Sequence, residues 1–296
     1  MKKIFLLSFS IIGVFLTNKL SAQQLGLQTL YNQNNYMINP AAAGIDDCIT
    51  ANLNHRSQWV GVSNNPKVNM LLLDNQLLKV HGFGIDVRNL SSGLLNSFNG
   101  KVSYAYHLQL KENHWLSAGL SVGIIQQRFK TTDAIVSDPT DNLLTQESQS
   151  DMGFSSDVGL IYRWDKLRIG LAVPQILASG LFVQYGPSSS KFRLVDHMNF
   201  YATYEVIDNE KWTASPSILY KNSDYKIHQI DIAMNAMWND MLGFGLMYRT
   251  TYGFAGLLEF KYDQYRFGYS YELGGRNITG VSVGTHEFMI GMKVCD

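Results

Sequence analysis

Long segments in which apolar and polar residues alternate constrain this chain more than any other feature. Between residues 101 and 110, the even positions from Val102 to Leu110 are apolar or aromatic, whereas the odd positions are mostly polar or small. The same period of two recurs in residues 116–124, 229–236 and 285–294. Because successive side chains of a β-strand point to opposite faces, each segment presents one apolar face and one polar or small-residue face. The period predicts an all-β protein.

The length of these segments separates a membrane barrel from a soluble β-sandwich, since both architectures alternate. Most segments run for about nine to twelve residues, which suits a tilted strand that crosses a bilayer and exceeds the ~5–6 residues typical of soluble sheets. The composition agrees, because only 16% of the residues are charged, compared with about 25% in soluble proteins. The fold class that we predict is a transmembrane antiparallel β-barrel, with apolar residues facing lipid and polar residues facing the lumen.

We expect about fourteen strands, an even number that returns both termini to the same side of the membrane. They are placed at residues 49–57, 66–73, 80–88, 99–109, 114–127, 153–163, 166–173, 197–206, 211–220, 226–237, 241–250, 253–262, 265–272 and 285–294.

The links between these strands alternate in length. Links after even-numbered strands are short, for example 110–113 and 164–165. Several links after odd-numbered strands are long, namely 89–98, 128–152, 174–196 and 273–284. Short periplasmic turns and longer external loops are typical of bacterial outer-membrane barrels. The sequence therefore predicts an outer-membrane location with both termini in the periplasm.

The N-terminus has the pattern of a secretory signal. Lys2 and Lys3 precede a largely apolar stretch over 4–16, and residues 20–22 supply a cleavage site that ends in a small residue. The apolar stretch is shorter than the ~20 residues that a membrane helix needs. Residues 1–22 are therefore predicted to be a cleaved signal peptide.

Two further parts complete the predicted domain organisation. Residues 23–47, rich in Gln and Asn, would form a periplasmic N-terminal segment or tuck into the lumen as a plug, and residues 48–296 would form the barrel. A partly plugged lumen suits a barrel between the small filled ones and the open porins. Cys48 and Cys295 could meet if the barrel closes on itself, although two free thiols fit the sequence equally well.

Tryptophans mark the predicted strand ends, where an indole ring can sit at the membrane interface. Four of them fall on the short-turn side, at Trp115, Trp164, Trp212 and Trp238, and Trp59 falls on the other.

The residues that could carry chemistry give no sign of an enzyme. The sequence has no HExxH, CxxC, GxSxG or P-loop, so we predict no catalytic residue, no cofactor and no metal. Zero net charge without a basic run argues against a nucleic-acid partner. Charged residues on the predicted lumen face are interpreted as paired or hydrated, and a selective pathway is the alternative. They are Lys101, Glu205, Asp231, Glu259, Lys261, Arg266, Glu272, Glu287 and Lys293.

Two long loops are the preferred contact surfaces for another protein, because loops of this length are often functional. Loop 128–152 carries Asp138, Asp141 and Asp151, which fit no EF-hand spacing. Loop 174–196 carries Tyr185, Pro187 and Phe192.

Two motifs go beyond a generic barrel pattern. Residues 36–44, Tyr-Met-Ile-Asn-Pro-Ala-Ala-Ala-Gly, resemble the "YM-x-NPA-x-AG" signature of the PorP/SprF family, and residues 55–61 with Pro66 resemble that family's "R-x-QW-x-G … P" segment. The motif residues, expected to be structural rather than to touch a partner, are Asn39, Pro40, Gly44, Arg56, Gln58, Trp59, Gly61 and Pro66.

The resemblance implies a non-enzymatic outer-membrane protein of the type IX secretion system. Its implied partners are a large secreted adhesin with a C-terminal sorting domain, components of the type IX translocon, and outer-membrane lipid. The implied role is export or cell-surface attachment of that adhesin, in some bacteria for gliding. The residues alone leave two other classes open, a channel for small solutes and, less favoured, a membrane-embedded Ser–His hydrolase.

Overall fold

The structure is a computed structural model, which describes residues 26, 28–130, 149–177, 181–185, 188–192, 197–223, 227–274 and 280–295. The predicted signal peptide at residues 1–22 lies outside these ranges. Within them, no helix is long and apolar enough to cross a membrane.

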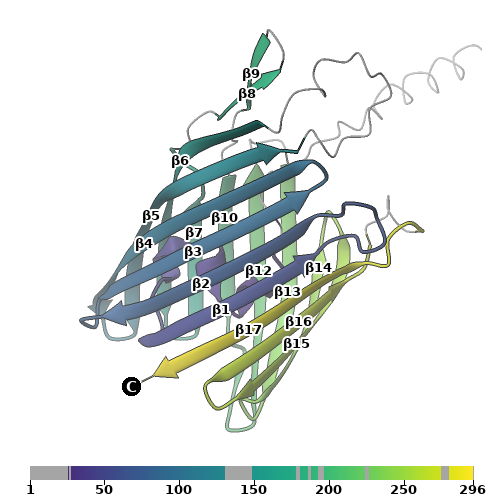
Figure 1. The fold of residues 1–296 in the computed structure, drawn as a ribbon. Helices are drawn as coiled ribbons and strands as arrows, with labels where there is room; N and C mark the ends of the chain where they lie inside the picture. The colour runs from purple at the N-terminus through teal and green to yellow at the C-terminus, as the bar shows by residue number, and fades with distance from the viewer. Residues whose placement is uncertain are drawn as a thin grey trace, which may run out of the picture.

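Fourteen antiparallel strands form a closed barrel (Figure 1). They are β1 (Cys48–Ser57), β2 (Lys67–Leu77), β3 (His81–Ser92), β4 (Leu95–Lys111), β5 (His114–Phe129), β6 (Gln149–Trp164), β7 (Leu167–Val173), β10 (His197–Tyr204), β12 (Trp212–Ser223), β13 (Ile227–Trp238), β14 (Leu242–Arg249), β15 (Gly253–Tyr262), β16 (Tyr265–Glu272) and β17 (Thr285–Cys295). Each predicted strand coincides with one of these, so the predicted fold class is confirmed.

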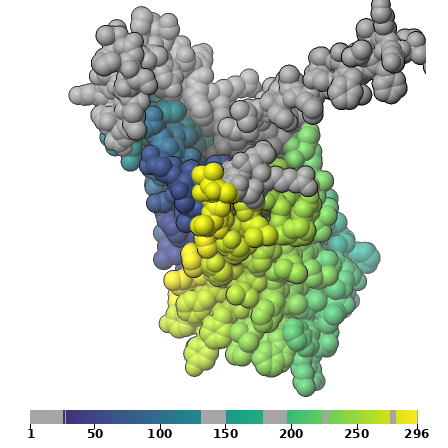
Figure 2. Space-filling model, turned by 90° about the vertical axis from the view of Figure 1, so that its right-hand side faces the viewer, coloured from purple at the N-terminus to yellow at the C-terminus, as the bar shows by residue number. Residues whose placement is uncertain are grey.

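The first and last strands close the barrel. β1 pairs with β17 in one unbroken register from Cys48 opposite Cys295 to Ser57 opposite His286. In Figure 2 the purple strands at the start of the barrel lie beside the yellow C-terminal strand. The barrel therefore has no free edge at this seam, and a closed barrel satisfies the backbone hydrogen bonds of both strands.

Additional short elements are not among the fourteen strands of the barrel wall. β8 (Leu181–Tyr185) and β9 (Ser188–Phe192) form a separate hairpin, and β11 (Ile207–Asp208) extends the pairing of β12. Three 3-10 turns precede the barrel, η2 (Leu30–Asn32), η3 (Asn35–Met37) and η4 (Pro40–Ala42).

The two faces of the wall follow the alternation. On β4, Lys101 and Ser103 are buried toward the lumen, whereas Val102 and Tyr104 on the outer face are 57% and 42% exposed. On β1, Leu53 is likewise exposed between two buried asparagines. An apolar outer face with a polar inner face is the arrangement that a barrel in a lipid bilayer requires.

The predicted long link at 89–98 is wrong. β3 continues to Ser92 and β4 starts at Leu95, so a tight turn joins them, with Gly93 at a φ of 56°. The segment 89–97, in which three leucines are mixed with Asn, Ser and Gly, continues the two strands into their turn. Alternation of hydrophobicity marks only the lipid-facing length of a strand. The prediction therefore missed the strand residues within 89–98.

We call the end with links 58–66, 130–148, 174–196 and 273–284 the loop end, and the opposite end the turn end. Residues 28–43, which we call the plug, run inside the barrel from the loop end toward the turn end (Figure 1). Gln28 accepts a hydrogen bond from Arg249 near the loop end, and Ala43 contacts His107 near the turn end. The chain then enters β1 at Cys48.

The two ends of the described barrel chain lie on opposite sides. Cys295 lies at the turn end beside Cys48, whereas Gln28 lies toward the loop end. Residues 1–25 and 296 lie outside the described residues, so the expectation that both termini are periplasmic stays a prediction.

The lumen is less polar than the alternation predicts. Apolar side chains of the plug, including Leu30, Tyr31 and Met37, pack against inward-facing Leu72 and Met289 in one buried cluster. Burial of apolar surface contributes roughly 25 cal/mol per Å². The plug thus gives the barrel a hydrophobic core that a water-filled lumen lacks.

Candidate functional site

The lumen contains two regions of different character. Toward the loop end, the plug and the wall are joined by buried ion pairs. Toward the turn end, a partly open cavity of about 560 Å³ separates the plug from the short turns. We call this cavity the vestibule.

An ion-pair network crosses the loop-end region of the lumen. Arg249 binds Glu272 at 2.7 Å and Asp231 at 2.9 Å. Arg56 binds the other oxygen of Glu272 and binds Glu287 at 3.1 Å. All five side chains are at most 3% exposed. Removing one member would leave a buried charge unpaired, which typically lowers the free energy of unfolding by about 3–5 kcal/mol.

The plug is part of this network. The Thr29 backbone N–H donates to Glu287 at 2.7 Å, and Arg249 donates to the Gln28 carbonyl at 3.0 Å. Arg56 also donates to the Thr29 hydroxyl at 2.9 Å. Hydrogen bonds to charged groups are about twice as strong as neutral ones. The network spans five strands, β1, β13, β14, β16 and β17, and holds the start of the plug through β1, β14 and β17.

Polar contacts hold the middle of the plug on the opposite wall. Arg88 donates to the Met37 carbonyl at 2.8 Å, and Tyr36 shares a 2.7 Å hydrogen bond with Ser103. Asn199 donates to the Ile38 carbonyl at 3.2 Å. These contacts come from β3, β4 and β10.

Asn39 and Pro40 of the first motif form the central turn of the plug. The Asn39 side chain accepts from Ala41 N–H at 2.9 Å, which caps η4, and donates to the carbonyls of Leu160 and Leu171. Pro40 occupies the first position of η4, where its missing N–H costs nothing.

Glycines on the wall make room for this turn. A Cβ built on Gly159 would lie 1.9 Å from Asn39 Oδ1, and one built on Gly119 would lie 2.3 Å from Ala41 N. No side chain larger than hydrogen fits these positions with the plug in place. Gly82, whose added Cβ would lie 1.9 Å from the Ala43 carbonyl oxygen, belongs to the same set.

Gly44 ends the first motif with a turn. Its φ is 63°, its N–H donates to Asp74 at 3.0 Å, and an added Cβ would lie 2.4 Å from the Asn75 carbonyl oxygen. Only glycine meets both conditions without strain.

The second motif, apart from Arg56, lies at the loop end. Gln58 N–H donates to the Pro66 carbonyl at 2.8 Å, and the Gln58 side chain donates to Tyr252 at 3.3 Å. Trp59 adopts a φ of 57° and packs near Tyr252, while Gly61 has a φ of 100°. These residues shape the link 58–66.

The link 58–66 is hydrogen-bonded to the end of the link 273–284. Val60 N–H donates to the Gly284 carbonyl, and Val283 N–H donates to the Val60 carbonyl. Val281 and Val283 are 69% and 65% exposed. The loop end thus presents a braced surface with apolar side chains.

The residues proposed for partner contact fall in different parts of the chain, and some lie outside the described residues. Asp138, Asp141 and Pro187 lie outside the described residues. Asp151 lies in β6 opposite Gln127 rather than in a loop, because β6 starts at Gln149. Tyr185 ends β8 and Phe192 ends β9, so both belong to the hairpin outside the wall.

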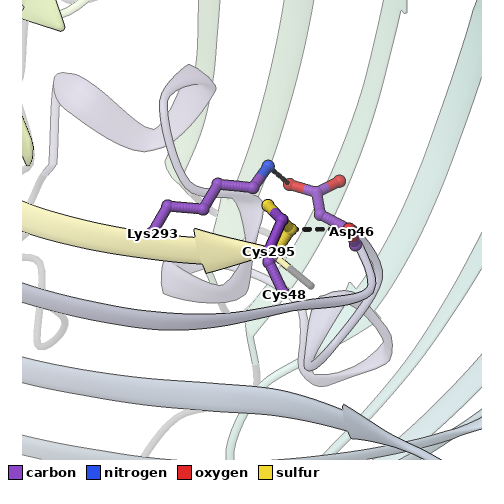
Figure 3. The surroundings of a disulfide bond; sticks show 4 residues. All are labelled: Asp46, Cys48, Lys293 and Cys295. Atoms are coloured by element: carbon purple, nitrogen blue, oxygen red, sulfur yellow. Dashed lines mark hydrogen bonds and ion pairs between the residues drawn. A yellow bond between two sulfur atoms is a disulfide. The ribbon is translucent and has the colours of Figure 1, made fainter. Parts of the chain in front are cut away.

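The barrel seam is joined covalently at the turn end (Figure 3). Cys48 and Cys295 form a disulfide, which resolves the alternative that the sequence left open. Beside it, Lys293 donates to Asp46 at 2.8 Å. Burial raises the pKa of Asp46, but the ammonium of Lys293 together with the guanidinium groups of Arg168 and Arg266 holds that pKa below its ordinary value.

The vestibule contains residues whose arrangement the sequence did not predict. Arg163 and Arg168 face each other across β6 and β7, and Arg163 lies 5.5 Å from the Trp115 ring. Trp115 therefore faces the lumen, and its placement in an interfacial belt is wrong. Trp164 and Trp212, in contrast, are exposed on the outer face. The sequence contained this information, because residues two apart on a strand face the same side and Ser117 faces the lumen. Trp115 should therefore also face the lumen.

No group of three or more metal-ligating side chains occurs among the described residues. The buried carboxylates that a cation would need are instead bound to arginine or lysine.

Comparison with known protein families identifies the family of this chain. The family model for the type IX secretion system membrane protein PorP/SprF matches residues 20–292. This chain belongs to the PorP/SprF family. The resemblance seen in the two motifs is confirmed, and membership together with the barrel fold shows an outer-membrane protein of the type IX secretion system.

Solved structures similar to this PorP/SprF chain are outer-membrane barrels. The Ralstonia pickettii toluene transporter TbuX has a TM-score of 0.55 at 14% identity, with 88% of this chain and 92% of that chain covered. The CymD monoaromatic hydrocarbon channel has a TM-score of 0.54 at 12% identity, with 91% and 94% covered. The P. putida toluene transporter TodX has a TM-score of 0.52 at 9% identity, with 88% and 93% covered. At such identities the likeness shows the fold alone. No curated protein matches the chain.

Proposed function

We propose that this barrel is a scaffold that holds a large secreted adhesin at the cell surface and supports its export with the type IX translocon. Family membership is the observation that carries the proposal. The plug supports it, because a lumen packed with apolar side chains and ion pairs suits a rigid mount better than a solute pathway. The adhesin would be recognised through its C-terminal sorting domain.

The loop end is the proposed contact surface. It combines the braced links 58–66 and 280–284 with the β8–β9 hairpin. Large apolar side chains on exposed loops are common at protein interfaces. Val281 and Val283 are such residues.

The proposed function is tested by deleting the chromosomal gene and following type IX secreted proteins with C-terminal sorting domains. We expect one large adhesin to be lost from the surface, and either retained in the cell or released into the medium, with the others displayed as before. Complementation by the wild-type gene should restore display. Normal surface display of every such protein in the deletion strain would overturn the proposal.

This function requires the loop end to face outward and the turn end to face the periplasm. Both cysteines of the chain are in the disulfide, so an introduced cysteine is the only free thiol. Ser63→Cys lies at the loop end and Glu210→Cys at the turn end, and both positions are exposed. A membrane-impermeant maleimide on intact cells should label the first and spare the second. The reverse result would invert the orientation.

A channel for small solutes is the second candidate. It is favoured by the likeness to channel barrels and by the vestibule. The contacts between the plug and both walls of the lumen weigh against it. Ion conductance discriminates between the two functions.

A further inference from the structure

The vestibule has a feature that the scaffold role leaves unused. Arg163 and Arg168 occupy directly opposite positions on β6 and β7, and both point into the lumen, where they line the cavity. Like charges directly opposite each other on neighbouring strands destabilise a sheet. Among the described residues, neither arginine forms an ion pair. Within this part of the chain, each guanidinium thus lacks a carboxylate within ion-pair distance, and the nearby Asp46 carboxylate acts on both only through space.

The two guanidinium groups are held in place by their remaining contacts. Arg163 donates to the Ile45 carbonyl at 3.3 Å and lies over Trp115, and its Nε has no hydrogen-bond partner among the described residues. Arg168 donates to Asn35 Oδ1 at 2.9 Å. Each arginine keeps further N–H donors, because a guanidinium carries five. Planar forks of this kind suit the two oxygens of a carboxylate.

The opposite wall of the vestibule has the other sign. Glu259 on β15 lines the cavity and forms no ion pair with a described residue. Lys261, on the same strand, is paired with Asp240. On the arginine side, Asp165 and Lys166 form the turn between β6 and β7, Glu205 follows β10, and Lys166 is paired with Asp208. A ligand that fits must therefore place an acidic group at the arginines and a basic group near Glu259.

The shape of the cavity limits what can enter. Its volume of about 560 Å³ lies within the roughly 300–1,000 Å³ of ordinary ligand sites. Small residues, including Ser215, Gly243 and Gly245, line part of its wall. Asn32 and Gln33 of the plug form its inner limit, so a ligand reaches it from the turn end.

We propose that the vestibule is a docking site for an extended peptide segment of a protein on the turn-end side, one that carries an acidic and a basic residue a few positions apart. The carboxylate would bind between Arg163 and Arg168, and the basic group would lie toward Glu259. Because Arg168 holds Asn35 of the plug and Arg163 holds Ile45 just after it, the docked segment would support the plug from the turn end. The site is separate from the loops proposed for the adhesin, so either proposal can fail alone.

The test uses the full-length protein in lipid nanodiscs and equilibrium dialysis of a labelled probe peptide, acetyl-Asp-Gly-Gly-Lys-amide. Saturable binding with a Kd below about 1 mM is expected. Arg163→Gln and Arg168→Gln should each weaken binding about tenfold or more, since each removes a charge-assisted hydrogen bond. Arg168→Lys should weaken peptide binding less than Arg168→Gln does. Arg128→Gln is the matched control, because Arg128 is exposed near the loop-end tip of β5.

Urea unfolding of each variant confirms that the barrel is intact. Equal binding by Arg128→Gln, Arg163→Gln and Arg168→Gln would overturn the proposal. So would equal binding of the uncharged probe acetyl-Asn-Gly-Gly-Gln-amide. Displacement of the peptide by inorganic phosphate at the same concentration would show an unselective anion site, and this result too would contradict a peptide site.

Discussion

The loop-end region of the lumen and the vestibule share one barrel wall but differ in what fills them. The loop-end region is dense, with apolar plug side chains and a buried network of five ion-paired side chains. The vestibule is partly open, and two of its arginines and a glutamate form no ion pair with a described residue. The difference shows that alternation determines which residues face inward, whereas the plug determines whether they become a core or line a cavity.

The largest expected effect contrasts one glutamate from each region. Glu272→Ala should lower the free energy of unfolding by about 3–5 kcal/mol, because it leaves Arg56 and Arg249 buried with too few carboxylates. Glu259→Ala in the vestibule should cost no more than about 1 kcal/mol. Urea titration in detergent micelles, followed by tryptophan fluorescence, measures both. Similar losses would mean that the loop-end network is not a buried core.

The disulfide tests how the turn end is held, where the described residues form only separate ion pairs. Replacing both Cys48 and Cys295 by serine should lower stability by about 2–4 kcal/mol, because the bond constrains a very long loop of the unfolded chain. A reductant should destabilise the wild type by a similar amount and leave the double variant unchanged. If the reductant affects the two equally, the seam does not depend on this bond.

The contact between wall and plug is tested by adding one methyl group. Gly159→Ala should cost about 1–3 kcal/mol, since its Cβ would overlap Asn39 Oδ1. Gly256→Ala is the matched control on the outer face, where an added Cβ meets nothing within 4 Å. Its effect should stay within about 0.5 kcal/mol. Equal tolerance of both changes would argue that the plug does not rest against β6.

The smallest effect is expected from the exposed ion pair beside the seam. Asp46→Asn should cost at most about 1 kcal/mol, because both side chains are partly exposed. The pKa of Asp46 is lowered in the folded protein, so its contribution is present above its ordinary pKa and is lost as the pH falls through the lowered value. Stability of wild type and Asp46→Asn should therefore converge in acid. A constant difference at every pH would assign the stabilisation to another contact.

The wall was predictable from the sequence because lipid imposes a two-residue period. That period identified every barrel strand and placed Asp231, Glu272 and Glu287 on the lumen face. It failed at 89–98, where the strands leave the apolar band and nothing distinguishes a polar strand from a loop.

The contents of the lumen were not predictable in the same way. The plug consists of short 3-10 turns, which have no hydrophobic period. Its first motif could be recognised only by resemblance. The partners of Arg56 depend on the closure of β1 against β17, which brings together residues more than 200 positions apart. Arg163 and Arg168 were closer to prediction, since they flank one short turn.

Single-channel recording of the full-length, disulfide-bonded protein in planar bilayers tests the central claim, a barrel that its own plug keeps closed. The account predicts no stepwise ion current, while a porin reconstituted in the same way gives clear steps. Stable current steps from the folded wild-type protein would contradict the account, because ions would then pass the region that Arg56, Arg249 and the plug fill.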